Sequence, residues 1–450
     1  MDQLLEENLA SEQLEKDFAG SQLDPPRQSS NPIRIMFITG EASGDHHGAT
    51  LVRAICEQRP WQKFEFFGAG GDEMRAAGVE IVKDIAELNI VGAEEFLGGF
   101  RRIWRAFYGL RDIAVQRRPD LIIFIDYPDF NMRLAKKLKR LGFATLYYIT
   151  PQVWAWRQHR VNALKRDFNR LLVILPFEKD FYQRAGVSVE FVGHPLLDSI
   201  KPETTVDEFC TNYGLDKNRR IITLLPGSRR KEIKGNLPDI FAAVSKLGER
   251  DFQFVLPRAS TVSMDNLMDV AKRFGGRIEP TTVHSADRYH VISLDGCRVT
   301  VLRGDSQNAI KHATLAIAAS GTVVLETGVI GTPMIIVYKI SKLNWRLFRW
   351  MIKVDYFGLV NLIAGREIVP ELIQDDFTGN RLFNLIIEMV GDKPRLDRMR
   401  SELQSVREML GTGASGRAAR AILETIDGDS STGISKAPGN KDRQTAIVSA

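Results

Sequence analysis

Cysteine is scarce in this chain of 450 residues, and the three that it has, Cys56, Cys210 and Cys297, stand far apart. Their number is odd and no two of them form a CxxC pair, which excludes a disulfide-stapled scaffold and a zinc site built from thiolates. Unpaired thiols are typical of a reducing compartment, so we expect a cytoplasmic protein.

The chain also lacks a secretory signal and a clear membrane-spanning run. Residues 1–20 contain several acidic side chains and no apolar stretch, unlike a signal peptide. Ala313–Tyr338 is almost uncharged, but it contains Glu326, three glycines and Pro333. A carboxylate inside a bilayer costs about 2.5 kcal/mol or more. We therefore predict a buried strand, turn, helix and strand over this segment.

Neither sign of charge dominates the chain, which has 61 basic and 56 acidic residues and a net charge of +5. That excess is too dilute to indicate nucleic-acid binding, so we expect no nucleic-acid partner. Hydrophobic residues make up 44% and charged residues 26%, which are ordinary values for a globular protein. The length predicts two to three domains.

Short apolar runs alternate with helical stretches, a pattern that predicts parallel, doubly wound sheets. We expect an α/β protein of two Rossmann-like domains that face each other across a cleft, with ligands beyond the carboxyl ends of the strands. The predicted units are a disordered extension (1–31), a first domain (32–200), a second domain (201–410), and a helix end with a disordered tail (411–450). The expected strands are 34–39, 64–67, 121–125, 145–149, 171–175, 221–225, 252–256, 313–318 and 334–337, whereas 281–305 gives no clear assignment.

Three glycine-containing turns follow predicted strands, where helix N-termini favour anions. The first contains Ser43, Gly44 and Asp45 and is suited to a phosphate or a hydroxyl-rich ligand, or is simply a tight turn. None of the three turns has the GxGxxG or the GKS/T spacing of the common nucleotide motifs.

The other two turns together predict a sugar-nucleotide pocket. Gly227, Ser228 and Arg229 would place backbone donors and a guanidinium on a diphosphate, unless they only begin a solvated basic helix. Ser320, Gly321 and Thr322 repeat the pattern, and Glu326 one turn later suits the vicinal hydroxyls of a ribose. A plain N-terminal glutamate that favours the helix dipole is the alternative for Glu326.

Asp126 directly follows the predicted strand 121–125 and is a candidate general base toward a hydroxyl. We interpret Asp129 as a helix cap rather than a metal ligand, because one strand-end acid and one cap do not make an octahedral site. We expect no metal.

An amphipathic stretch with four arginines predicts contact with acyl chains or with an anionic membrane surface, although such an apolar face can also belong to a core. A similar mixture recurs at 343–353, and a nucleic-acid surface would need a broader basic channel. The side chains expected on the apolar face are Phe96, Leu97, Phe100, Ile103, Trp104 and Phe107.

These motifs together resemble the lipid-A-disaccharide synthase family, inverting glycosyltransferases of the GT-B architecture. The resemblance runs from about residue 33 to about residue 410, and the combination of PQVWAWRQ and LLPGSR is specific to it. The matching stretches are GEASGD (40–45), IDYPDFN (125–131), TPQVWAWRQHR (150–160), LPFEKDFY (175–182), VGHPLLD (192–198), LLPGSRRKEI (224–233), ASGTVVLE (319–326) and VNLIAGREIVPELIQ (360–374).

The resemblance implies transfer of 2,3-diacylglucosamine from UDP-2,3-diacylglucosamine to 2,3-diacylglucosamine 1-phosphate at the cytoplasmic face of the inner membrane, without a cofactor. It implies Asp126 as the base, Arg229 at the leaving UDP, and Asn361 among the UDP-sugar-binding residues. The first domain would then bind the acceptor and lipid, and the second the UDP-sugar. Two other functions remain as alternatives, namely another UDP-sugar enzyme of the same two-domain form and a non-catalytic protein that binds a nucleotide sugar. A homodimer is a further expectation.

Overall fold

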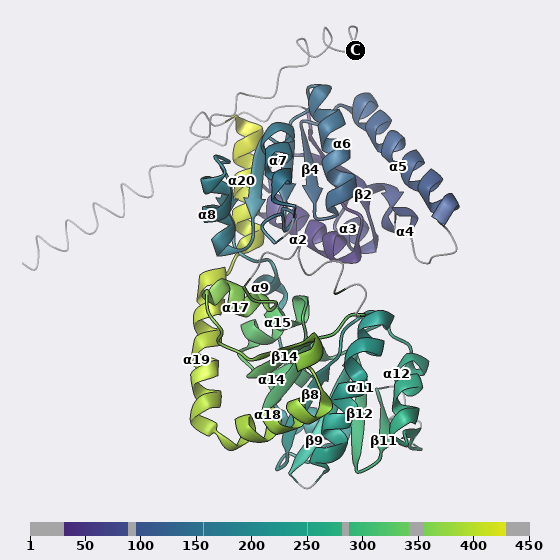
Figure 1. Cartoon of the computed structure of the whole chain (residues 1–450). Coiled ribbons are helices and arrows are strands. Elements are labelled where there is room, and N and C mark those ends of the chain that lie inside the picture. The colour runs from purple at the N-terminus through teal and green to yellow at the C-terminus, as the bar shows by residue number, and fades with distance from the viewer. Residues whose placement is uncertain are drawn as a thin grey trace, which may run out of the picture.

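The computed structural model describes residues 31–88, 96–155, 157–249, 251–280, 288–341, 345 and 355–428. Two α/β lobes follow each other along the chain, each built on its own sheet (Figure 1). Three predicted segments lie wholly or mostly outside the described residues. They are the extension over 1–31, of which only residue 31 is described, the tail from 429 onward, and most of the stretch 343–353.

The first sheet is entirely parallel, with the strand order β3-β2-β1-β4-β5-β6-β7. Alternate residues of its central strands pack into cores on opposite faces. Ile35 and Ile123 contact the core that includes helix α2 (Ala42–Gln58), whereas Met36 and Ile122 contact the core that includes α5 (Phe96–Arg117). Burial on both faces is why these strands are continuous apolar runs in the sequence.

The second sheet has the order β10-β11-β12-β9-β8-β13-β14-β15. Its strands from β12 to β15 are parallel, and β10, β11 and β12 add an antiparallel edge. The segment 281–305, which the sequence leaves without an assignment, therefore contains the hairpin of β11 (Tyr289–Leu294) and β12 (Cys297–Arg303).

The nearly uncharged segment 313–338 forms strand β13 (Leu315–Ala319), helix α15 (Thr322–Ile330) and strand β14 (Met334–Tyr338), which confirms the predicted strand, turn, helix and strand. Within the described part of the chain, no helix combines the length and apolar character needed to cross a bilayer.

The remaining strands are β1 (Ile33–Ile38), β2 (Phe64–Gly70), β3 (Glu80–Asp84), β4 (Leu121–Ile125), β5 (Thr145–Tyr148), β6 (Arg170–Val173), β7 (Glu190–Phe191), β8 (Arg220–Leu225), β9 (Phe252–Arg258), β10 (Arg277–Ile278) and β15 (Glu371–Ile373). The remaining helices are α3 (Asp72–Ala76), α4 (Ile85–Leu88), α6 (Pro128–Arg140), η2 (Gln158–Arg160), α7 (Val161–Asp167), α8 (Pro176–Arg184), α9 (Leu196–Ser199), α10 (Val206–Tyr213), α11 (Arg230–Leu247), α12 (Met264–Ala271), η3 (Lys272–Phe274), α14 (Ser306–Lys311), α17 (Leu359–Ala364), η5 (Gln374–Asp376), α18 (Gly379–Gly391), α19 (Lys393–Leu410) and α20 (Ala414–Asp427).

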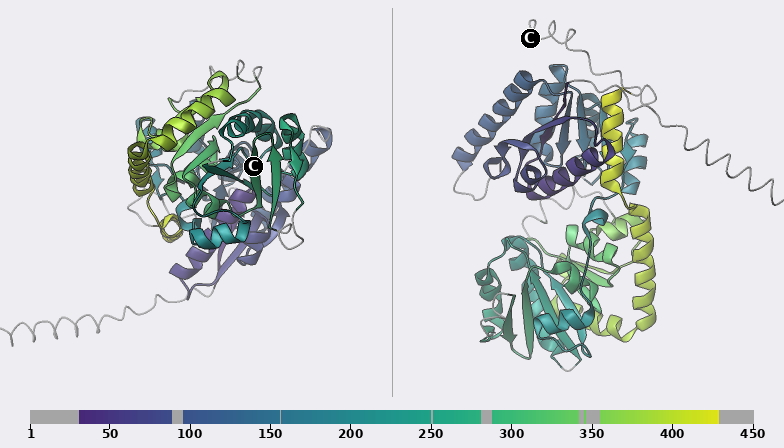
Figure 2. Two further views of the ribbon diagram at one scale, coloured as in Figure 1. Left: turned by 90° about the horizontal axis from the view of Figure 1, so that it is seen from below. Right: turned by 180° about the vertical axis from the view of Figure 1, so that it is seen from behind.

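The last helix, α20, returns to the first lobe after α19 has run along the second, so that α20 lies beside α2 and α8 (Figures 1 and 2). Arg170 at the start of β6 holds it: its guanidinium donates to the Ala421 carbonyl at 2.6 Å and to Glu424 at 2.9 Å. The segment from 411 therefore contains a packed element of the first lobe, beyond the helix end expected there.

Candidate active site

Asp126 and Tyr127 follow strand β4 with backbone φ angles of 45° and 52°, in the left-handed region that non-glycine residues seldom adopt. The Asp126 carbonyl accepts hydrogen bonds from the Asn131 amide at 2.6 Å and from the Tyr147 hydroxyl at 2.8 Å. A Cβ on Gly40 would lie 2.4 Å from the Tyr127 ring, so the first glycine turn packs directly against this bend. Strain that the surroundings enforce in this way is typical of functional sites.

The Asp126 carboxyl sits at the edge of the sheet, as the sequence predicts. Its burial, and after that the nearby Glu41 carboxylate, raise its pKa, while the Tyr127 N–H lowers it. A carboxylate with a raised pKa binds a proton more strongly, which suits a general base.

A cavity of about 890 Å³ is lined by Tyr127, the residue after Asp126, and by Glu41. Ile103, Trp104 and Phe107 line it, so this part of the predicted apolar face of α5 faces a cavity. Phe96, Leu97 and Phe100 belong to the same helix, but their side chains lie outside the described residues.

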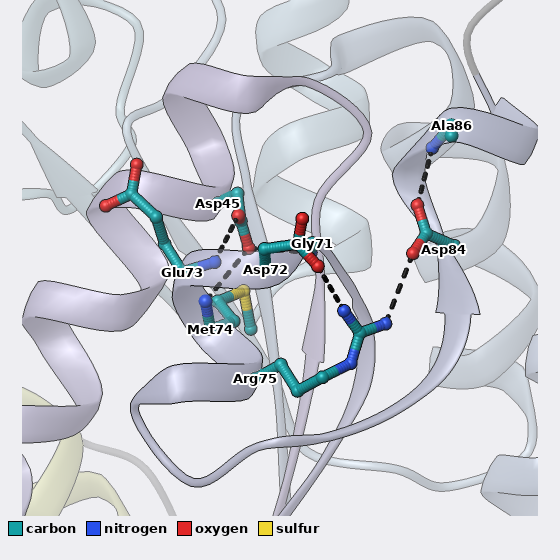
Figure 3. A network of polar contacts seen from close by, with 8 residues as sticks. All are labelled: Asp45, Gly71, Asp72, Glu73, Met74, Arg75, Asp84 and Ala86. Atoms are coloured by element: carbon teal, nitrogen blue, oxygen red, sulfur yellow. Dashed lines mark hydrogen bonds and ion pairs between the residues drawn. The ribbon is translucent and has the colours of Figure 1, made fainter.

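The first glycine turn differs from its predicted role as a ligand loop. The buried Asp45 carboxylate accepts the backbone N–H groups of Gly71, Glu73 and Met74 at 2.6, 3.0 and 3.2 Å, and so caps helix α3 (Figure 3). Gly44 allows close packing, since a Cβ there would lie 1.9 Å from the Thr39 hydroxyl. Ser43 is exposed. Asp45 and Gly44 thus build the fold, and Asp45 is already fully engaged.

A second cavity, of about 560 Å³, lies at the carboxyl edge of the second sheet. The two predicted turns meet there, although they are almost one hundred residues apart in the sequence. Helix α15 begins at this cavity and has no side-chain cap, so its first backbone N–H groups and its dipole face the cavity. The predicted residues that line it are Gly227, Ser228, Arg229, Ser320, Gly321, Thr322 and Glu326.

The N–H groups of Ser228 and Arg229, which we expected to bind an anion, both donate to the Glu232 carboxylate, at 2.9 and 3.2 Å. Gly227 has a φ of +119°, and a Cβ on it would lie 2.4 Å from the same carboxylate. This part of the prediction is wrong, because the chain supplies its own anion. The Arg229 side chain lines the cavity, pairs with Glu232 at 3.4 Å and is 79% exposed, so its guanidinium can also contact an anion there.

Glu326 lies one turn into α15 and is largely buried against α14. Burial raises its pKa, and hydrogen bonds with the side chains of Gln307 and Ser306 oppose that rise. Its carboxylate is thus oriented by two polar neighbours at the cavity wall.

Asn361 is fully buried and does not line the second cavity. Its amide nitrogen donates to the Val369 carbonyl and to Glu371, both at 2.8 Å, and its oxygen accepts the N–H groups of Ile368 and Val369. The predicted role in nucleotide binding is therefore corrected: Asn361 holds the loop between α17 and β15.

Several residues of the first cavity were not singled out from the sequence: Arg133, Arg157, His159 and Arg160. Asp129 is not a helix cap as predicted, because it accepts hydrogen bonds from Arg160 at 2.6 Å and from Arg157 at 3.5 Å. The two arginines in the stretch 150–160, Arg157 and Arg160, were the sequence signal that could have pointed to this basic part of the cavity.

Glu178 holds the loop from which these arginines come. Its buried carboxylate accepts the Trp154 indole N–H at 3.1 Å and the N–H groups of Ile174 and Leu175 at 3.1 and 2.9 Å. Burial raises the pKa of Glu178 to about 7, although the hydrogen bonds to its carboxylate act to lower this pKa.

Arg229 lines the second cavity, whereas the first cavity is lined by Tyr127, which follows Asp126, and not by Asp126 itself. The two cavities have no lining residue in common. Each cavity lies at the carboxyl edge of its own sheet. Among the residues that the structure describes, no group of three or more His, Cys, Asp or Glu side chains is arranged to hold a metal ion.

A family model described as lipid-A-disaccharide synthetase matches residues 35–424. The chain is 43% identical over 396 residues to the lipid-A-disaccharide synthase of Geobacter sulfurreducens, covering 87% of this chain and 97% of that protein. It is 39% identical to the lipid-A-disaccharide synthase of Myxococcus xanthus, covering 88% of this chain and 98% of that one. The chain belongs to the lipid-A-disaccharide synthase family. It is thus a glycosyltransferase of lipid A biosynthesis.

Solved structures share the fold. A UDP-GlcNAc 2-epimerase from Neisseria meningitidis bound to UDP-GlcNAc gives a TM-score of 0.57 at 11% identity, covering 88% of this chain and 99% of that chain. The calicheamicin glycosyltransferase CalG4 gives 0.52 at 13% identity, covering 87% and 98%. At such identities the likeness concerns the fold alone, and it confirms the GT-B arrangement of two Rossmann-like domains.

The corrected role of Asn361 has a measurable consequence. Asn361→Ala leaves the buried N–H groups of Ile368 and Val369 without an acceptor, so we expect the free energy of unfolding to fall by about 2–4 kcal/mol. Chemical denaturation measures this change. Asn218→Ala, at an exposed position, should change it by less than about 0.5 kcal/mol. Equal stability of the two variants would contradict the structural role.

Proposed function

We propose that this protein transfers 2,3-diacylglucosamine from its UDP ester to the 6-hydroxyl of 2,3-diacylglucosamine 1-phosphate, releasing UDP. The observation that supports this most is the pair of unlike cavities at the carboxyl edges of the two sheets. One combines apolar and basic side chains next to Tyr127, the residue after Asp126, and the other combines the N-terminus of α15, whose N-cap residue is Gly321, with Arg229.

The second cavity is the donor site in this proposal. The N-terminus of α15 and the Arg229 guanidinium attract the diphosphate, and Glu326 accepts hydrogen bonds from the ribose hydroxyls. The same positive groups stabilise the negative charge that grows on UDP as the glycosidic bond breaks.

The first cavity is the acceptor site. The acceptor oxygen attacks the anomeric carbon, its proton passes to the Asp126 carboxylate, and UDP leaves with the electron pair of the broken carbon–oxygen bond. This single displacement inverts the anomeric configuration. The raised pKa of Asp126 supports its role, since it strengthens the carboxylate as a base.

The membrane side of the proposal is supported by α5. Trp104 is 49% exposed and Tyr108 is 38% exposed on this helix, near the apolar wall of the first cavity. Amphipathic aromatic side chains of this kind favour a membrane interface. The proposed place of action is the cytoplasmic face of the inner membrane, with the acyl chains of both substrates drawn from the lipid.

Loss of the proposed base tests the reaction. Wild-type protein incubated with both substrates should form the disaccharide 1-phosphate, detected by mass spectrometry. Asp126→Asn should lower kcat by about 10²–10⁴-fold, because the amide cannot take the proton. Asp180→Asn, at an exposed position on α8, should match wild type. Product formation at an unchanged rate by Asp126→Asn would remove this residue as the base.

The pH profile tests the influence of Glu41. Asp126 acts as a base only when ionised, so kcat/KM declines as the pH falls through its pKa. Because the Glu41 carboxylate helps to raise that pKa, Glu41→Gln should move the acidic limb of the profile to lower pH, by up to about one pH unit. A limb that stays in place would show that another group titrates there.

The donor site is tested by UDP affinity, measured by isothermal titration calorimetry. Arg229→Gln should weaken UDP binding about 10- to 100-fold, because the neutral amide cannot replace the charge-assisted hydrogen bond of the guanidinium. Arg230→Gln is the matched control, since the neighbouring Arg230 does not line the cavity, and it should bind UDP within about threefold of wild type. Equal losses in both variants would point to general charge attraction instead.

A further inference from the structure

The lining of the first cavity combines apolar and basic side chains. Its apolar part, the apolar wall, comes from α5, with Ile103, Trp104 and Phe107, and from Pro128 and Phe130 on α6. Its basic part, the basic wall, comes from Arg133 on α6 and from Arg157 and Arg160 in the segment before α7. A lining of this kind suits an anionic amphiphile.

The basic wall is organised around one carboxylate. Arg160 donates to Oδ1 of Asp129 at 2.6 Å, and Arg157 lies 3.5 Å from the same oxygen. Arg133 is four residues after Asp129 on α6, hence on the same side of that helix. The Asp129 side chain is 64% exposed, so this carboxylate stands at the surface of the cavity.

The charges of this wall leave room for an added anion. Three arginines line the cavity, against the two carboxylates of Glu41 and Asp129. An exposed ion pair contributes only about 0–1 kcal/mol, so Asp129 is a weak competitor for the guanidinium groups. A phosphate monoester brings about −1.5 to −2 charges and three acceptor oxygens, which match the planar forks of arginine.

The backbone also fixes the position of this wall. Arg157 has a φ of 56°, a strained value for a residue other than glycine, and it is the N-cap residue of the short helix η2. Trp154, three residues earlier, is anchored through its indole N–H to the buried Glu178. The loop thus presents Arg157 and Arg160 from a defined place.

We propose that Arg133, Arg157 and Arg160 bind the phosphate monoester of the acylated sugar acceptor and thereby determine acceptor specificity. The inference rests on the proposed function and assigns residues to its acceptor. The acyl chains lie along the apolar wall, and the sugar between the two walls turns a hydroxyl toward Asp126. Phosphate binding then fixes which hydroxyl reacts.

The test compares two acceptors, 2,3-diacylglucosamine 1-phosphate and the same acylated sugar without phosphate. Wild type should prefer the phosphorylated acceptor in kcat/KM. Arg133→Gln, Arg157→Gln and Arg160→Gln should each lower kcat/KM for that acceptor about 10- to 100-fold and leave kcat/KM for the unphosphorylated one within about threefold. Arg160→Lys, which retains the charge without the fork, should recover part of the preference.

Arg140→Gln is the control, because Arg140 is exposed at the end of α6 and does not line the cavity. UDP affinity should stay at the wild-type value in all variants, and retained turnover of the unphosphorylated acceptor shows that the first lobe, which carries the substitutions, is folded. If the three variants retain the full phosphate preference, the assignment is overturned. If wild type forms no disaccharide from either acceptor, the proposed function fails instead.

A lipid headgroup is the other source of a phosphate for this wall. Sedimentation with vesicles of phosphatidylglycerol and phosphatidylcholine, against phosphatidylcholine alone, separates the two. The acceptor assignment predicts that Arg157→Gln and Arg160→Gln bind both vesicles as wild type does. Loss of binding to the anionic vesicles together with an intact acceptor preference would assign the arginines to membrane phosphate and contradict the proposal.

Discussion

The parallel direction of the strands is the constraint on which the site depends. In the first sheet, and from β12 to β15 in the second, every strand ends at the same edge, so the turns that follow the strands gather there. Asp126 follows β4, Ser228 lies just beyond β8, and Ser320 follows β13. Within the second sheet, Ser228 and Ser320 therefore meet although they lie far apart in the sequence. The hydrogen bonding of buried backbone leaves only the sheet edges free for polar chemistry.

The turns differ in whether a carboxylate of the chain itself already accepts their backbone N–H groups. Asp45 satisfies the N-terminus of α3, and Glu232 satisfies the turn before α11. The N-cap residue of α15 is Gly321, which has no side chain to cap the helix, and among the described residues no hydrogen bond from another side chain to its first N–H groups is seen. An anion that comes from outside gains most where the chain has supplied none of its own, which is why we propose the N-terminus of α15 as the binding site of the diphosphate.

The sequence was sufficient for the buried parallel strands and for the meeting of the two turns in the second lobe. Strand β4 matches its predicted bounds, because five consecutive buried apolar residues leave little ambiguity. The short strands β3 and β7 and the antiparallel edge were not predicted, since strands of a few half-exposed residues resemble loops in sequence.

Within the site, the errors concern residues whose partners are distant. Asp45 looked like a ligand-binding residue because its hydrogen-bond donors, the backbone N–H groups of Gly71, Glu73 and Met74, lie on another element. Asn361 was assigned to the UDP-sugar through the family resemblance, because its hydrogen bonds to Val369 and Glu371 form only once the loop has folded and are not visible in the sequence. The proposed role of Arg157 depends on a left-handed backbone and on its approach to Asp129, and neither follows from local sequence pattern.

The central claim is that donor and acceptor occupy different lobes and that the acceptor hydroxyl meets Asp126. A crystal structure with UDP and 2,3-diacylglucosamine 1-phosphate bound together tests it most directly. The account predicts the diphosphate at the N-terminus of α15 beside Arg229, and the acceptor 6-hydroxyl within hydrogen-bond distance of the Asp126 carboxylate. Both ligands in a single lobe, or an acceptor with its hydroxyl turned away from Asp126, would contradict it.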